Sequence, residues 1–261
     1  MSFIKDLQIG LSSYGKAVDF IFTNRLYYFF LIPIALNILL FSISYYFVSN
    51  ITIELIDYLK ASWNPEEWDF WGASILAGTI GVLIWLILRI LFFLLFAFIG
   101  GYVILILLSP VLAYVSEKTE QIMNGNQIEF SWKQLFKDMW RGILLAIRNF
   151  LIEISLVIVL FALSFFPLIG FASAPILFLI SAYFYGFSFM DYNLERRKMN
   201  IKESVDFISR NKGLAIANGS LFALALLIPF IGVSLSGFLA IISTVAATLA
   251  LLKKEAIVTT H

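Results

Sequence analysis

The side chains best placed for chemistry are charges that lie inside or beside long apolar runs. Arg89 is the one charge within the apolar segment Gly72–Val115. An ionisable residue at the centre of a membrane span costs roughly 2.5–3.5 kcal/mol on insertion scales, so it often marks a pathway or a binding site. Arg89 could hold an anion, reach the headgroups, or pair structurally with Glu153. Arg148 lies five residues before Glu153, a spacing that favours an interfacial anchor over a helical ion pair.

Other charges gather where apolar runs end. Arg196 and Arg197 follow one run, where they could attract anions to a vestibule or simply hold a turn through an ion pair with Asp191. Glu117 and Glu120 follow another run and lie three residues apart, so they share one helical face. They could line an entrance, bind cations, or belong to a solvated helix end.

The composition offers no catalytic apparatus. The chain has no cysteine, and its one histidine is His261, to which we assign no role. Glycine motifs for phosphates or dinucleotides, a metal cluster and a Ser-His-Asp set are all missing from the sequence. We therefore expect no enzyme, no metal and no cofactor. The net charge of +1 gives no argument for nucleic acid as a partner.

The elements that must position these charges belong to a membrane protein. Of the 261 residues, 61% are hydrophobic and 13% are charged, whereas soluble domains carry about 25% charged residues. The first apolar run, residues 26–48, is too long for a signal peptide and predicts a transmembrane helix. The second, residues 72–115, would be about 66 Å long as a straight helix. It should therefore kink at Gly100-Gly101 or Pro110, or project from the bilayer.

Two amphipathic helices and two helical hairpins are expected beside these runs. Residues 1–22 and 131–143 have apolar stripes at steps of three and four, which suits a membrane surface. For residues 1–22, packing on the protein itself is an equal alternative. Hairpins are predicted at 142–190 and 213–252, turning near Pro167 and Pro229.

The first arms of these hairpins look short. Only 13 residues separate Glu153 from Pro167, and 15 separate Gly213 from Pro229. Apolar stretches of about 10–14 residues are more typical of buried or re-entrant segments than of full crossings. The two hairpins also share short patterns, which indicates either a weak internal repeat or chance similarity.

The cationic residues predict the topology. Sixteen of the 18 Lys and Arg residues lie before Leu26, at 118–148, at 196–212, or at 253–254. The positive-inside rule places all four regions, and both termini, in the cytoplasm. Each hairpin would then begin and end inside, either crossing twice or dipping into the membrane and returning.

Several local patterns resemble one known family. Asn24–Asn37, Ser109–Glu120, Met190–Arg197 and the Ile228-Pro229 turn resemble, in order and spacing, segments of CysZ-type proteins. That superfamily includes bacterial sulfate permeases and animal etoposide-induced endoplasmic-reticulum proteins. The resemblance implies two long transmembrane helices, two hairpins that penetrate part of the membrane, and assembly into homo-oligomers.

The resemblance also implies an anion site, with one departure. The permease branch carries a basic pair, associated with sulfate, just before the first membrane helix; here Tyr27 and Tyr28 stand at that place and only Arg25 is basic nearby. Tyrosines donate hydrogen bonds but supply no charge, and charge-assisted bonds are about twice as strong. The expected anion-binding set is Arg25, Tyr27, Tyr28, Arg89, Glu117, Arg196 and Arg197.

Two functions remain open from the sequence. The first is transport: residues 1–261 would form a single domain in the cell's inner membrane, and this domain would pass a small inorganic anion such as sulfate. The second is a scaffold or membrane-shaping protein, because amphipathic helices and half-inserted hairpins would wedge one leaflet of the lipid bilayer.

Overall fold

The protein is built from helices. The computed structural model describes residues 2–63, 73–125, 132–228 and 231–259, and every element in these ranges is helical. Four described helical stretches are long and apolar enough to cross a membrane: Tyr102–Asn124, Met139–Leu163, Gly170–Arg196 and Ser234–Ile257. Phe3–Thr23 and Leu26–Leu40 form a bent pair that would count as a fifth. The predicted class, an all-α integral membrane protein, is confirmed.

The chain groups into two compact units, and each is described by itself. One unit comprises residues 34–100, and the other comprises residues 1–33 and 101–261. Helix α3, Ala73–Asn124, contributes residues to both. The prediction of a single membrane domain stays a prediction.

The two long helices predicted from the sequence are present with different ends. Helix α2 spans Leu31–Trp63, well past the expected end at Val48. The extension carries the charged residues Glu54 and Asp57. The helix continues past them because no proline or glycine interrupts it before Trp63. Helix α3 is continuous over 52 residues with Pro110 inside it, whereas about 20 residues suffice to span a bilayer.

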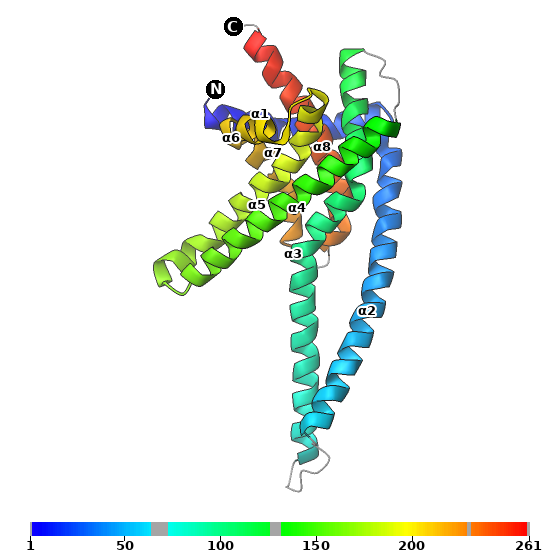
Figure 1. The fold of residues 1–261 in the computed structure, drawn as a ribbon, viewed down its shortest axis with the longest axis vertical. Helices are drawn as coiled ribbons and strands as arrows, with labels where there is room; N and C mark the ends of the chain where they lie inside the picture. Colours follow the sequence, from blue (N-terminus) through cyan, green and yellow to red (C-terminus); the bar gives the residue numbers. More distant parts are fainter. Residues whose placement is uncertain (1, 64–72, 126–131, 229–230, 260–261) are drawn as a thin grey trace. The chain divides into compact units, whose positions relative to one another are not determined.

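The first predicted hairpin consists of α4, Trp132–Leu163, and α5, Pro167–Arg196, which pack side by side (Figure 1). The amphipathic segment 131–143 is not separate but forms the first part of α4; Ser131, its expected cap, lies outside the described residues. Helix α4 contains a stretch of 25 residues and α5 one of 27 residues, and each could cross a membrane fully. The first arm looked short because Glu153 was treated as its boundary, whereas this residue is buried inside the helix.

The second hairpin consists of α7, Lys212–Leu226, and α8, Ile231–Thr259, with the amphipathic helix α6, Ile201–Arg210, before it. Pro229 and Phe230, the expected turn, lie outside the described residues. Helix α7 has only 15 residues, so the short first arm expected from the sequence is found in this hairpin.

Helix α1, Phe3–Thr23, lies across α7 and α8 (Figure 1). Ile9, Ala17 and Ile21 on its inner face are buried, which confirms that this helix packs on the protein itself. Its opposite side still exposes large apolar residues: Ile4, Leu11, Val18 and Phe22. Helix α1 therefore has one face for the bundle and another that is suited to lipid.

Helices α5 and α7 cross at very close range because their contact is made of small residues. A Cβ added to Gly219 would lie 1.8 Å from the carbonyl oxygen of Ala182, and one added to Gly186 would lie 1.8 Å from that of Ala215. Small residues four apart on both helices let the backbones touch, as in other membrane helix pairs.

We expect Gly219→Ala to lower the free energy of unfolding by roughly 3 kcal/mol, because the added methyl group forces the two backbones apart. Gly15→Ala is the matched control, since nothing lies within 4 Å of a Cβ at that position of α1. It should be neutral or slightly stabilising. Thermal denaturation in detergent compares the two variants, and equal midpoints would contradict the close crossing.

Candidate functional site

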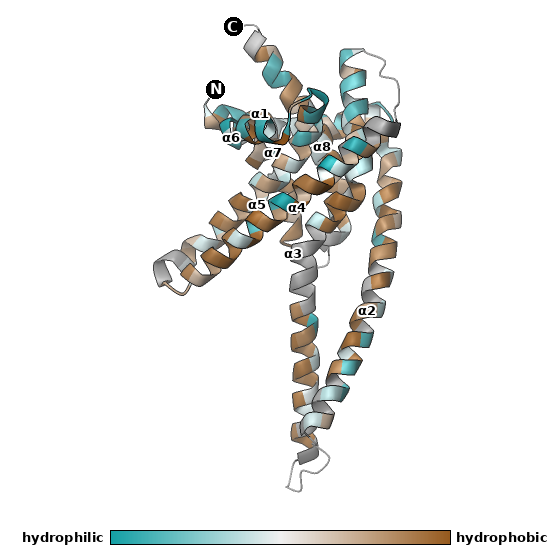
Figure 2. Cartoon of the chain, viewed as in Figure 1, coloured by the Kyte–Doolittle hydropathy of each residue, from teal (hydrophilic) through white to brown (hydrophobic). Residues whose placement is uncertain are grey.

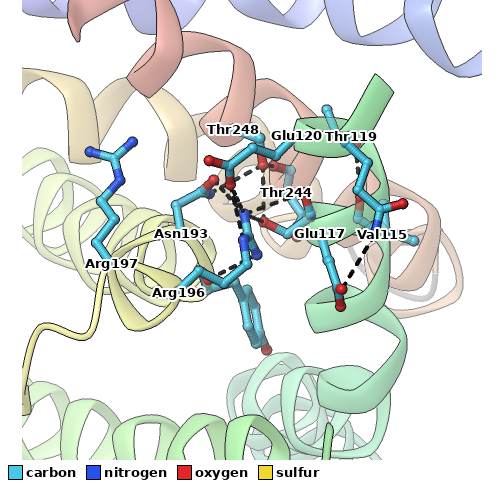
Figure 3. A network of polar contacts seen from close by, with 12 residues as sticks. Val115, Glu117, Thr119, Glu120, Asn193, Arg196, Arg197, Thr244 and Thr248 are labelled. Atoms are coloured by element: carbon cyan, nitrogen blue, oxygen red, sulfur yellow. Dashed lines mark hydrogen bonds and ion pairs between the residues drawn. The ribbon is translucent and has the colours of Figure 1, made fainter. Parts of the chain in front are cut away.

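A buried polar network joins the ends of α3 and α5 (Figure 3). At its centre, Arg196 donates to Glu120 Oε2 at 2.7 and 3.0 Å, to Asn193 Oδ1 at 2.8 Å and to Ser116 Oγ at 3.0 Å. A further bond reaches the carbonyl oxygen of Tyr192. All three guanidinium nitrogens are therefore engaged, and Glu120 is the counter-ion of Arg196.

Helix α8 completes this network through Thr248. Its hydroxyl lies 3.1 Å from Ser116 Oγ, receives a bond of 3.1 Å from Asn193 Nδ2, and donates to the carbonyl oxygen of Thr244. Ser116, Asn193 and Thr248 are at most 1% exposed. Buried networks in which each group is satisfied fix a unique arrangement, so this network holds the guanidinium of Arg196 in place.

A second buried cluster surrounds Arg141 of α4. The guanidinium binds Asp191 with two bonds of 2.8 and 2.9 Å and lies 3.7 Å from Glu195. It also donates to Ser204 Oγ at 2.7 Å and to the carbonyl oxygen of Met199. This one side chain therefore ties α4 to α5 and to α6.

A pocket of about 1000 Å³ lies between these helices. Arg141 and Arg196 line it, together with Glu117 and Glu195. Its remaining lining combines lysines, apolar side chains and one amide: Lys137, Trp140, Leu144, Lys198, Met199, Asn200, Ile201 and Lys202. Five cations face two carboxylates in this lining, so the pocket favours an anionic ligand.

Two further polar clusters lie within the candidate spans. Glu153, 1% exposed, accepts hydrogen bonds from the hydroxyls of Tyr102 and Ser181. Arg148 instead donates to Asn149 and stacks over the Phe187 ring at 5.8 Å. Arg148 and Glu153 thus have different partners, which agrees with the sequence argument against a direct pair.

The two ends of the chain are joined by a buried ion pair. Lys254 of α8 binds Asp6 of α1 at 2.6 Å and also donates to the Asn211 side chain. Asp6 is 3% exposed, so this pair fixes α1 against the bundle.

The predicted site residues do not form one site. Arg196 lies in the network, whereas Arg197 points away from it (Figure 3). Arg197 pairs instead with Glu255. Burial lowers the pKa of the Arg197 guanidinium below its ordinary value, an effect that Glu120 opposes. Glu117 accepts a bond of 3.4 Å from Gln121 and lines the pocket.

The other predicted site residues lie elsewhere. Arg25 is exposed and adopts a left-handed backbone conformation (φ 56°) just before the 3₁₀ helix η1, Leu26–Phe30. Tyr27 and Tyr28 in η1 are half exposed. In the other unit, the Arg89 guanidinium stacks over Trp85 at 5.2 Å, and its buried Nε has no hydrogen-bond partner among the described residues.

Asp191 has a different partner from the one predicted. The turn after α5 was expected to be held by Asp191 with Arg196 or Arg197, whereas Asp191 binds Arg141. Sequence reasoning missed Arg141 and Lys254 because each pairs with residues far away along the chain. The available signal for Arg141 was only its position on the polar side of an amphipathic stripe. Within the described ranges, no group of three His, Cys, Asp or Glu residues could hold a metal ion.

The fold and these clusters define a polytopic α-helical membrane protein with buried charge networks at its helix ends. The family model for Sulfate transporter CysZ/Etoposide-induced protein 2.4 matches residues 13–235, so the chain belongs to this family. The resemblance drawn from short sequence patterns is thereby confirmed.

Curated relatives align with this chain over most of their lengths. The "Sulfate transporter CysZ" of Pseudomonas paraeruginosa PA7 is 24% identical over 219 residues, 83% of this chain and 85% of that protein. The protein of the same name from Pseudomonas aeruginosa PAO1 is 25% identical over the same shares. That of Pseudomonas fluorescens Pf0-1 is 24% identical over 78% of this chain and 79% of its own length.

Proposed function

We propose that this protein transports a small inorganic anion, with sulfate as the first candidate, across the inner membrane of the cell. The observation that carries the proposal is the family match over residues 13–235, with relatives named sulfate transporters aligned along most of both chains. No enzymatic chemistry is part of this proposal, and the family resemblance supports a homo-oligomer.

Arg196 is the cation that we propose the anion meets. It lines the pocket and reaches into the buried network, so it connects open space with the helix bundle. A planar guanidinium binds a tetrahedral oxyanion through two parallel bonds. Because Glu120 occupies those donors in this structure, an arriving anion would have to displace this carboxylate. In this proposal, the Arg196–Glu120 ion pair acts as an internal gate, which opens when the anion displaces Glu120.

Arg25 and Arg89, which belong to different units, are each proposed to assist anion transport. Arg25 stands close to where the permease branch keeps its basic pair, and its exposed side chain is accessible to an anion. Among the described residues, the buried Nε of Arg89 is a donor without an acceptor. Tyr27 and Tyr28 add hydroxyl donors but no charge, so this part of the path should discriminate less by anion charge.

We expect Arg25→Ala and Arg89→Ala each to reduce protein-dependent sulfate flux into liposomes by at least about tenfold, or about 1.4 kcal/mol, since each removes a charge that offsets dehydration of the anion. Arg89→Lys should keep part of the flux if charge alone matters, and little if the guanidinium geometry matters. Full flux in both alanine variants would remove these residues from the mechanism.

The proposed orientation places both termini in the cytoplasm, as the sixteen clustered cations predict. Because the chain has no cysteine, single cysteines at Ser62, Gly125 and Asn200 report the topology directly. Only the cysteine at position 62 should react with an impermeant thiol reagent in intact cells. External labelling at position 125 or 200 would reverse the proposed orientation, and labelling after permeabilisation controls for accessibility.

A scaffold or membrane-shaping role is the second candidate. Helix α1 exposes four large apolar residues on its outer side, among them Ile4 and Phe22, which would insert into one leaflet. Purified protein in liposomes separates the two proposals, because a transporter produces sulfate uptake whereas a scaffold produces only deformation or tethering of the vesicles.

A further inference from the structure

Three lysines on the rim of the pocket have no partner within the described part of the chain. Lys137 comes from α4, Lys198 from the connection between α5 and α6, and Lys202 from α6. The two arginines in the lining are already paired with carboxylates. The positive charge available to a ligand at this pocket therefore comes from these lysines.

The negative groups nearby offset only part of this charge. Glu195 lies 3.7 Å from Arg141, and Glu117 lies beside Gln121. If the arginine partners Asp191 and Glu120 outside the lining are included, five cations still face four carboxylates. Lysine is a flexible point charge without the rigid fork of arginine, so three of them suit a mobile, charged group better than a fixed small ion.

An apolar stripe begins at the same pocket and follows α4. Its residues recur at steps of three and four and are each more than 40% exposed: Phe136, Trp140, Leu144, Ile147 and Leu151. Trp140 and Leu144 also line the pocket. The candidate span of α4 begins at Met139, so the lysines lie where this helix enters the apolar layer; Figure 2 shows hydrophobic residues continuing along α4 beyond that point.

We propose that this pocket binds the phosphate-bearing headgroup of an anionic phospholipid, with the acyl chains lying along the apolar stripe of α4. Lysines meet the phosphate, and Trp140 lies at the headgroup level, where tryptophan is favoured. A volume of about 1000 Å³ is far larger than a tetrahedral oxyanion needs, and a free oxyanion gains nothing from the apolar stripe. The three lysines are not part of the proposed gate, although Arg196, the cation of that gate, lines the same pocket.

Lipid binding to the purified full chain tests the proposal. Native mass spectrometry in neutral detergent would count bound phosphatidylglycerol and bound phosphatidylcholine of identical chain length. We expect wild type to prefer the anionic lipid by at least about tenfold, and the triple variant Lys137→Gln/Lys198→Gln/Lys202→Gln to lose most of this preference.

The matched control removes the same charge elsewhere. Lys5, Lys16 and Lys253 are exposed, lie outside the pocket, and can be replaced by glutamine together. This variant should keep the wild-type preference, and unchanged helical circular dichroism in both triple variants shows that they fold. An equal loss in the control would mean diffuse attraction to the membrane and would overturn the proposal.

Inorganic sulfate and inorganic phosphate distinguish a lipid site from a free-anion site. At millimolar concentration and constant ionic strength, neither should displace bound phosphatidylglycerol, because neither fills the apolar part of the site. Displacement by either anion, at concentrations at which chloride has no effect, would assign the lysines to a free oxyanion and overturn the proposal.

Discussion

Arg141→Ala is expected to lower the free energy of unfolding by about 3–5 kcal/mol, because it leaves buried carboxylates without their cation. Asp191 is 3% exposed and Glu195 is 6% exposed, so water solvates neither carboxylate well while Arg141 is in place. The change also frees Ser204 and the Met199 carbonyl, which Arg141 holds between α5 and α6. The midpoint of thermal denaturation in detergent should fall strongly.

Two further variants test whether the lost ion pair causes this effect. Arg210→Ala removes an exposed arginine at the end of α6, and its midpoint should stay close to that of wild type. Adding Asp191→Asn to Arg141→Ala should recover part of the stability, because a neutral amide is cheaper to bury than an unpaired carboxylate. A double variant less stable than Arg141→Ala would show that Asp191 has another essential partner.

Arg196→Ala is expected to reduce sulfate flux about a hundredfold. That factor corresponds to about 2.7 kcal/mol, within the range for hydrogen bonds to a charged group. Arg196→Lys should keep more flux than the alanine variant but less than wild type, because lysine supplies charge without the bidentate fork. Flux is measured in liposomes and normalised to folded protein, since Arg196→Ala also disturbs the network around Asn193 and Thr248.

Glu120→Gln tests the gate itself. Glutamine keeps the size of the side chain but removes the charge that competes with the anion for Arg196. Half-maximal flux should therefore occur at a lower sulfate concentration than in wild type. A flux that depends on sulfate as in wild type would show that Glu120 is not displaced, and wild-type flux in Arg196→Ala would exclude Arg196 as a ligand.

The helices of this fold were predictable where apolar periodicity and prolines define them. The positions of α1 and of both hairpins follow from such patterns, and Pro167 opens α5 within the predicted turn. Helix ends were less predictable, because charged residues do not stop a helix. Glu54 and Asp57 continue α2, and Glu153 lies buried inside α4, where Tyr102 and Ser181 satisfy it.

The candidate site was only partly predictable for a different reason. Arg196 was marked by its place at the end of an apolar run and Glu120 by its spacing from Glu117, but neither pattern could show that the two pair across two helices. Likewise, Asp191 meets Arg141 across 50 residues of sequence. Such pairs depend on which helix faces pack together, and this information is not contained in local spacing.

The central claim, that this chain carries a small inorganic anion across a membrane, is tested most directly by sulfate uptake into liposomes. Vesicles with purified protein and protein-free vesicles of the same lipid would be exposed to an inward gradient of labelled sulfate. We predict protein-dependent uptake that saturates with sulfate and falls about a hundredfold with Arg196→Ala. Uptake equal to that of protein-free vesicles, from protein that is folded and inserted, would contradict the claim and favour the scaffold role.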